Sequence, residues 1–425
     1  MIKNIEELTA ASAKASAWQS LWTFPSMIIS ALVIAWGAES AQFLVSQAFA
    51  LTMLALIQTL PEFAVEGVIA WNAGKFPTIT NIGLMTANFT GAIRLLVGLG
   101  WPLIFATTVI FNLRKNKKLS IARIDLEDEH AVEVSGLFIG ATYSFIIVAK
   151  GTLSIIDSFI LFTIYGFYVA VLLKLPTRDE AQIAELEAVP RFILTRKRRL
   201  RNMLIWMCFL CGGGGIVLVA DPFLESALGL SFVLGVPAFM LIQWLAPFLS
   251  EFPEKISAFY WAKSVVKAPM ALMNMTSSAI AEFTLLIAVI PIVFCIALGR
   301  VESIPFDWMH RAEILLTATQ GILGVAILSK MKFRWFEALG LFVLWFTQIY
   351  FQYMASQVSL PFTTDPTSHK IIWDIFHIRI LEFYIAIYWV WIILELGIIL
   401  VVNRKSPLLS SLKIAWASRL QNKKA

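Results

Sequence analysis

Long runs without a charged residue are the feature that most restricts the fold of this chain. A helix needs about 20 residues to cross about 30 Å of hydrocarbon, and many runs here approach or exceed that length. They therefore predict about eleven membrane-spanning helices. Seven runs are clear, at 21–38, 135–149, 152–173, 203–220, 312–329, 335–354 and 378–402, and four are interrupted by Pro, Gly or a charge, at 41–72, 79–112, 231–262 and 268–299.

The composition leads to the same fold class. Of the 425 residues, 59% are hydrophobic and 15% are charged, which is more apolar surface than one soluble core can bury. A membrane β-barrel would instead show short segments that alternate between polar and apolar residues. We therefore predict an all-α polytopic membrane protein that has the lipid bilayer as its solvent.

The distribution of Lys and Arg predicts the orientation, because positively charged loops stay in the cytoplasm. With the N-terminus outside, the inner side carries most of the basic residues, in the segments 114–123, 174–201, 330–334 and the C-terminal tail and at Lys255, Lys263 and Lys267. The basic loops and the C-terminus are then cytoplasmic, and the membrane is expected to be the cell membrane. The net charge of +6 is thus a topology signal and does not indicate nucleic-acid binding, which needs a basic face on a soluble fold.

No motif in the chain supports an enzyme or a bound cofactor. The four histidines form no H-E-x-x-H, and neither G-x-S-x-G nor a phosphate-binding loop occurs. Cys208 and Cys211 form a C-x-x-C inside an apolar run, where packing is the favoured role. The glycine run 212–215 favours close helix packing or a sliding surface.

Two interrupted runs contain the same proline and glutamate pair. The first reads Gln-Thr-Leu-Pro-Glu at 58–62 and the second reads Ser-Glu-Phe-Pro-Glu at 250–254, so 192 residues separate the two prolines. A second correspondence has an offset of 180, since Lys150, Asp157 and Phe162 recur as Lys330, Glu337 and Phe342.

Repeats of this kind are typical of transporters built from two inverted halves, whose broken helices meet at the binding site. We therefore predict a first repeat of five helices over 1–174, a cytoplasmic linker over 175–202 and a second repeat of five helices over 203–354. The remainder, 355–425, is predicted to hold a loop, one extra C-terminal helix and a basic tail. Near its start, Asp365, His369, Asp374 and His377 favour a re-entrant or surface loop over a metal site.

A Pro-Glu pair inside a membrane helix has a chemical meaning. Proline removes one backbone hydrogen bond and frees carbonyl groups that lipid cannot satisfy. A carboxylate at the centre of a membrane helix costs about 2.5–3.5 kcal/mol unless a cation or a proton compensates it. Two such pairs that face each other would form an oxygen-rich cage for hard cations, whereas an isolated pair would be a kink with a glutamate that reaches the surface.

These residues resemble the cation/calcium exchanger superfamily, which includes sodium/calcium and proton/calcium antiporters. The family repeats carry a T-S-x-P-E helix break, then a helix with G-S-N-x-x-[ND], then an apolar run that ends near a proline. The first repeat keeps Thr59, Pro61 and Glu62, and its residues 95–102 look like the trailing segment. The second keeps Ser250, Pro253 and Glu254, and Pro291 closes its helix.

The resemblance implies a site for transported cations. It places Glu62 and Glu254 on the broken helices, with Arg94 and Glu282 opposite them. It also implies four neutral oxygens, from Thr59, Thr90, Ser250 and Ser278, and one additional carboxylate, from Glu251. Glu66, one turn beyond Glu62, is either a further acid at the entrance or solvated.

Arg94 is the main departure from the family pattern. A guanidinium stays charged in proteins, so it can act as a tethered cation in an acidic cage, paired with Glu282 or Glu62. That would displace a mobile ion and favour proton coupling, another cation or a changed stoichiometry. The sequence thus predicts an antiporter of Ca²⁺ or another small cation, coupled to Na⁺ or H⁺ by alternating access. The alternative is a non-transporting structural or regulatory subunit whose ion site Arg94 locks.

Overall fold

The computed structural model describes residues 10–41, 43, 59–116, 122–173, 186–359, 366–403 and 407–422. Most of these residues are helical, which confirms the predicted all-α class. Within the described part of the chain, nine helical segments are long and apolar enough to cross a membrane. They are Ala11–Ala41, Ile79–Arg114, Asp128–Lys150, Ile155–Leu172, Arg198–Leu234, Val265–Leu298, Trp308–Leu328, Trp335–Gln357 and Ile375–Ile399.

The two other predicted spans are broken helices. Of 41–72, the structure describes little before α3 (Leu60–Lys75). The span predicted at 231–262 consists of the end of α9 followed by α10 (Ala238–Ser250) and α11 (Phe252–Lys263). Each of α3, α10 and α11 is shorter than a bilayer requires. The count of eleven spans stays a prediction.

The remaining elements follow in chain order. In the first half they are α1 (Ala10–Ala41), α4 (Ile79–Leu95), the π-helical turn η3 (Leu96–Gly100), α5 (Trp101–Asn116), β1 (Arg123–Asp125), the short 3₁₀ turn η4 (Asp128–His130), α6 (Ala131–Lys150), β2 (Thr152–Leu153) and α7 (Ile155–Leu172). After these come α8 (Ala188–Leu194), α9 (Arg198–Leu234), the 3₁₀ turn η6 (Val265–Lys267), α12 (Ala268–Ala281), the π-helical turn η7 (Glu282–Leu286), α13 (Ile287–Leu298), β3 (Ile304–Pro305), α14 (Trp308–Leu328), β4 (Lys332–Arg334), α15 (Trp335–Ser359), α16 (Pro366–Asn403) and α17 (Pro407–Asn422).

Two short antiparallel ladders join the halves. β1, which precedes α6, pairs with β4, which follows α14. β2, which follows α6, pairs with β3, which precedes α14. The helices α6 and α14 therefore run antiparallel, and they pack against each other. Their last turns lead into the repeated residues Lys150 and Lys330, so equivalent helices run in opposite directions, as inverted halves require.

The repeated residues make the same contact in both halves. Lys150 forms an ion pair with Asp157 at the start of α7, and Lys330 forms one with Glu337 at the start of α15. Lys330 also contacts Glu395 of α16 at 2.5 Å. In each half the lysine therefore links the end of one helix to the start of the next.

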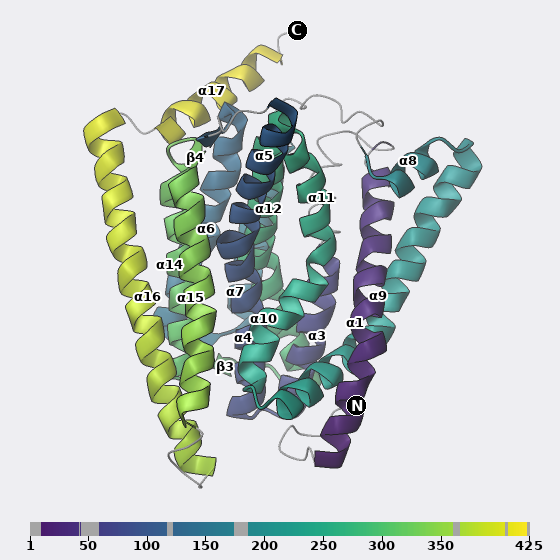
Figure 1. The fold of residues 1–425 in the computed structure, drawn as a ribbon, viewed down its shortest axis with the longest axis vertical. Coiled ribbons are helices and arrows are strands. Elements are labelled where there is room, and N and C mark those ends of the chain that lie inside the picture. The colour runs from purple at the N-terminus through teal and green to yellow at the C-terminus, as the bar shows by residue number, and fades with distance from the viewer. Residues whose placement is uncertain are drawn as a thin grey trace.

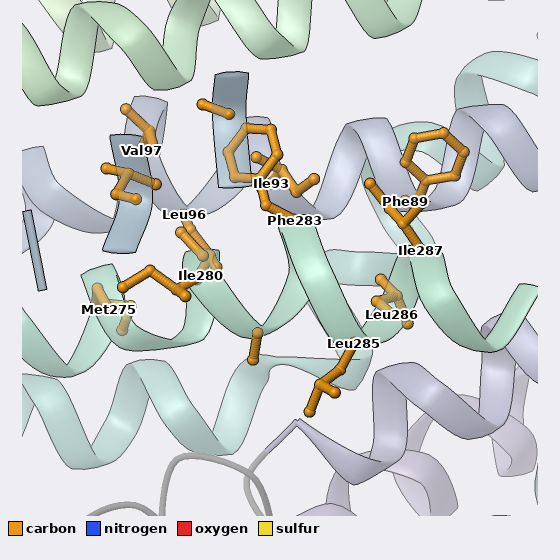
Figure 2. Packing of buried hydrophobic residues seen from close by; sticks show 14 of the residues in the cluster. Phe89, Ile93, Leu96, Val97, Met275, Ile280, Phe283, Leu285, Leu286 and Ile287 are labelled. Atoms are coloured by element: carbon orange, nitrogen blue, oxygen red, sulfur yellow. The ribbon is translucent and has the colours of Figure 1, made fainter. Parts of the chain in front are cut away.

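The two halves interlock through one apolar core. The helix α3 packs against α13, and its counterpart α11 packs against α5. Figure 2 shows the side chains between the two π-helical regions, where Ile93 and Leu96 of the first half lie near Ile280 and Phe283 of the second. A close-packed core of this kind holds the backbone of both halves in a fixed relation.

The helices α1 and α9 form a closely packed pair at one edge of the molecule, and α15 and α16 lie at the opposite edge (Figure 1). Glycine allows the approach of α1 to α9, because a Cβ atom at Gly212 would lie 2.8 Å from the carbonyl oxygen of Ser30. A Cβ atom at Gly215 would lie 2.4 Å from the hydroxyl oxygen of the same serine. The sequence predicted either close helix packing or a sliding surface for the glycine run. Gly212 and Gly215 pack closely against α1.

Candidate functional site

The helices α3 and α11 both begin at the Pro-Glu pairs. Pro61 and Pro253 lie in the first turn of their helices, where a proline costs no hydrogen bond because the first N–H groups of a helix have no partner within it. Glu62 and Glu254 follow in the same turn. The positive end of the helix dipole therefore lies beside each carboxylate. In the second half, the single residue Glu251 separates α10 from α11, which is the break that the sequence predicts.

Glu62 is joined to the second half and to α4 by hydrogen bonds. The hydroxyl group of Ser250 donates to one oxygen of Glu62. Nδ2 of Asn88 lies 2.5 Å from the other oxygen of Glu62 and 2.8 Å from an oxygen of Glu66. Both glutamates are at most 1% exposed. Asn88 thus uses its two N–H donors to hold two buried carboxylates together, and Glu66 is not solvated.

Three carboxylates and one lysine come from the second half. Glu251, Glu254 and Glu282 are at most 1% exposed, and Lys255 Nζ lies 2.6 Å from an oxygen of Glu251. Glu282 interacts electrostatically with both halves, through Glu62, Glu251, Glu254 and Lys255. We call the five glutamates 62, 66, 251, 254 and 282, together with Lys255, the carboxylate cluster.

Two members of the cluster lack the partners that a buried carboxylate needs. Among the described residues, neither oxygen of Glu254 and neither oxygen of Glu282 accepts a hydrogen bond of normal geometry, and the hydroxyl of Ser278 is a polar group that lies beside Glu254. Buried polar groups are almost always satisfied, and an unpaired buried charge is very unfavourable. The cluster therefore has the chemistry of a site that is completed by cations or protons.

Most of the site residues expected from the sequence come together in this cluster. Glu62, Glu251, Glu254 and Glu282 belong to it, Ser250 bonds to Glu62, and Ser278 lies beside Glu254. Thr59 is buried at the N-cap position of α3, three residues before Glu62. Lys255 was expected in a cytoplasmic loop, and this was wrong, because its side chain is 9% exposed and turns back to Glu251.

Thr90 and Arg94 lie in a different cluster, which corrects their expected position. Nη2 of Arg94 pairs with Glu313 of α14 at 2.5 Å, and both side chains are fully buried. Nε of Arg94 donates to the carbonyl oxygen of Thr90 at 3.1 Å. Glu313 also accepts from Gln243 at 3.0 Å. The expected pairing of Arg94 with Glu282 or Glu62 is therefore wrong.

His377 completes this second group, which we call the Arg94 cluster. Its ring Nε2 bonds to the second oxygen of Glu313, and the side chain is fully buried. The expectation of a re-entrant or surface loop was wrong for His377, which lies within α16, while Asp365 lies outside the described residues. The Arg94 cluster thus ties α4, α10 and α14 to the extra C-terminal helix.

Helix geometry explains the shift of Thr90 and Arg94. Two residues along an α-helix turn the side chain by about 200°, so Thr90 faces nearly away from Asn88. The π-helical turns begin at Leu96 and Glu282, 186 residues apart, and at this offset the motif Asn-x-Thr occurs at 88–90 and again at 274–276. The start of the π-helical turn lies six residues before Pro102 but nine before Pro291. A register counted back from the prolines therefore misaligns the repeats.

The comparisons with known proteins agree with this architecture. The family model described as sodium/calcium exchanger protein matches residues 15–174 and 204–354, which is most of the chain. The chain belongs to the sodium/calcium exchanger family. It is thus an integral membrane protein of a transporter family and not an enzyme. None of the curated proteins gave a significant match.

Two solved exchangers illustrate the similarity of this family member to known structures. The crystal structure of the H⁺/Ca²⁺ exchanger CAX has a TM-score of 0.72 and 29% identity, and the similarity covers 92% of each chain. The sodium-calcium exchanger NCX_Mj, soaked with 2.5 mM Na⁺ and 0.1 mM Ca²⁺, has a TM-score of 0.51 and 14% identity over 79% of this chain and 98% of that one. The NCX_Mj comparison supports the fold alone.

Proposed function

We propose that this protein is an antiporter that moves Ca²⁺ in exchange for protons and binds both at the carboxylate cluster. The observation that carries the proposal is the pair of buried carboxylates, Glu254 and Glu282, that have no hydrogen-bond donor among the described residues. Carboxylate oxygens are the ligands that Ca²⁺ prefers. The cluster draws on both halves, as the midplane site of an alternating-access transporter does.

Two observations favour protons over Na⁺ as the coupling ion. The carboxyl groups of Glu251 and Glu282 are neighbours in the cluster, and two carboxyl groups can form a hydrogen bond to each other only after one of them binds a proton. The similarity to the H⁺/Ca²⁺ exchanger CAX also extends over nearly the whole of both chains. Proton binding at such a pair would be displaced by a divalent cation.

The pair α1 and α9 is the candidate for the moving part. It lies at the edge of the fold and meets the cluster through α11, where Ser257 donates to Glu39 of α1 at 2.6 Å. Small residues along the contact between α1 and α9 let the two helices move as one unit. Sliding of this pair along the fixed core would open the cluster to each side in turn.

The orientation and the division of the chain remain proposals of the same kind. The positive-inside rule supports an outer N-terminus and a cytoplasmic C-terminus in the cell membrane. The antiparallel course of α6 and α14 supports two inverted repeats, at 1–174 and 203–354, joined by a cytoplasmic linker. The non-transporting alternative depended on Arg94 in the ion site, and Arg94 is engaged with Glu313 elsewhere.

The test is ⁴⁵Ca²⁺ uptake into proteoliposomes under a pH gradient, a Na⁺ gradient or no gradient. Wild-type protein is expected to take up Ca²⁺ under the pH gradient, and Glu62→Gln and Glu254→Gln are expected to reduce the rate at least about tenfold, because each removes a charged ligand. Glu302→Gln, at an exposed surface ion pair, is the matched control and should keep the wild-type rate. Equal uptake by all variants without a gradient would exclude antiport, and uptake under the Na⁺ gradient alone would exclude proton coupling.

A further inference from the structure

We propose that the ammonium group of Lys255 is a built-in cation of the transport site and takes the place of one mobile monovalent cation beside Glu251. The inference rests on the proposed function, because it concerns the charge that the same cluster carries. It goes further by assigning a fixed occupant to part of that cluster. Glu251 and Lys255 are four residues apart, across the break that begins α11, and they form an ion pair at 2.6 Å.

The first line of support is position. Lys255 is one residue after Glu254, and its side chain is 9% exposed. Its charge acts on four carboxylates from both halves, which are Glu62, Glu251, Glu254 and Glu282. An ion pair on the surface of a helix would instead join one lysine to one carboxylate in water, where such pairs contribute little to stability. Lys255 is therefore part of the cluster's charge balance.

The second line of support is the asymmetry of the repeats. At the offset of 192 that aligns the Pro-Glu pairs, Lys255 corresponds to Phe63 and Glu251 to Thr59. The first half builds the same helix start without either charge. The break in the helix thus requires no lysine, and the added glutamate and lysine come as a pair.

The third line of support is the remaining binding capacity of the ammonium group. It carries three N–H donors, and Glu251 is its hydrogen-bond partner among the described residues. A compact point charge on a flexible stem resembles a bound monovalent ion more closely than a guanidinium does. With Lys255 present, the five carboxylates need one mobile positive charge fewer.

The direct test is equilibrium binding of ²²Na⁺ to purified protein at alkaline pH, where protons compete least for the carboxylates, by a scintillation proximity assay. Lys255→Gln is expected to bind one more Na⁺ per molecule than wild-type protein does, and Ca²⁺ should displace that ion. Lys255→Arg keeps the charge and should bind no additional Na⁺. Lys263→Gln is the matched control, because it removes a lysine from the end of the same helix, where Nζ lies over the ring of Tyr260 at 4.2 Å. Equal Na⁺ binding by wild type and Lys255→Gln would overturn the proposal.

A rescue experiment covers the case in which Lys255→Gln does not fold. Glu251→Gln removes one negative charge and leaves the ammonium group free to turn to the other carboxylates. The cluster is then more positive by one charge, so the Ca²⁺ concentration for half-maximal uptake should rise about tenfold or more. The double variant Glu251→Gln with Lys255→Gln restores the net charge and should return most of the way to the wild-type value. A double variant no better than Glu251→Gln alone would overturn the proposal.

The two proposals fail in different ways. Absence of gradient-driven Ca²⁺ uptake by the wild-type protein would remove the antiporter function, yet the ²²Na⁺ measurement would still show whether Lys255 excludes an ion. Wild-type exchange with unchanged Na⁺ binding in Lys255→Gln would keep the function and remove the built-in cation.

Discussion

Replacement of Glu313 by glutamine should destabilise the protein strongly, because it leaves the charge of Arg94 buried without its partner. The Arg94 and Glu313 side chains are fully buried and 2.5 Å apart. At an effective dielectric constant of about 20, their attraction is ~7 kcal/mol, and desolvation offsets most of it. Removal of one partner from such a pair costs about 3–5 kcal/mol, because the other charge stays buried without compensation.

Glutamine keeps the shape of Glu313 and can still accept hydrogen bonds from Arg94 and Gln243, so we expect a loss near the lower limit, about 3 kcal/mol. The assay is the free energy of unfolding in mixed micelles titrated with SDS. Glu302→Gln is the control, since Arg300 and Glu302 are 71% and 48% exposed, and its cost should stay below about 1 kcal/mol.

The double variant Arg94→Met with Glu313→Gln separates charge from shape. It removes both charges and should be more stable than Glu313→Gln alone, because replacing both members of a buried pair is often close to neutral. A cost of less than about 1 kcal/mol for Glu313→Gln would refute the reasoning. So would a changed ion selectivity in Arg94→Asn, because the Arg94 cluster would then belong to the transport site.

Three further predictions concern other contacts. Gly212→Ala should destabilise the protein by about 1–3 kcal/mol, because the added methyl group meets Ser30 in α1. Gly214→Ala has open space and should not destabilise it, so equal free energies of unfolding for the two variants in SDS would contradict the close contact. Lys330→Met should lower the free energy of unfolding by about 3 kcal/mol or more, because Glu337 and Glu395 would stay buried without a cation. The same titration should show a smaller loss for Lys150→Met, where the lysine is 38% exposed. Asn88→Leu should raise the Ca²⁺ concentration for half-maximal uptake about tenfold, since it removes the donors that hold Glu62 and Glu66 together, and an unchanged value would show that Asn88 does not organise the site.

The class of fold could be predicted from the sequence because the bilayer imposes it. Only helices and closed β-barrels satisfy their backbone within hydrocarbon, and apolar runs of about 20 residues indicate the helical class. The Pro-Glu pairs were equally informative, since a proline kinks or breaks a helix and a carboxylate that faces lipid is costly. The apolar runs and the Pro-Glu pairs are both local patterns in the sequence. The Pro-Glu pairs also identified two members of the carboxylate cluster, Glu62 and Glu254.

The residues that sequence reasoning missed are those whose role depends on register or on distant partners. Asn88 was missed because the register was counted back from Pro102, which lies six residues after the start of its π-helical turn, whereas Pro291 lies nine residues after the start of the other. Its signal was the motif Asn-x-Thr, which recurs 186 residues later. Glu313 and His377 are 219 and 283 residues from Arg94, and no local pattern connects them. Lys255 had a visible signal in its spacing of four residues from Glu251, which places the two on one helix face.

The two halves differ in the partners that they give to their buried carboxylates. In the first half, Glu62 and Glu66 share the neutral donor Asn88. In the second half, Glu251 has the cation Lys255, while Glu254 and Glu282 have no donor among the described residues. A mobile cation therefore meets two carboxylates that share a neutral donor in the first half and two that have no donor among the described residues in the second. The strongest attraction comes from the second half, and Lys255 limits how many charges it can hold.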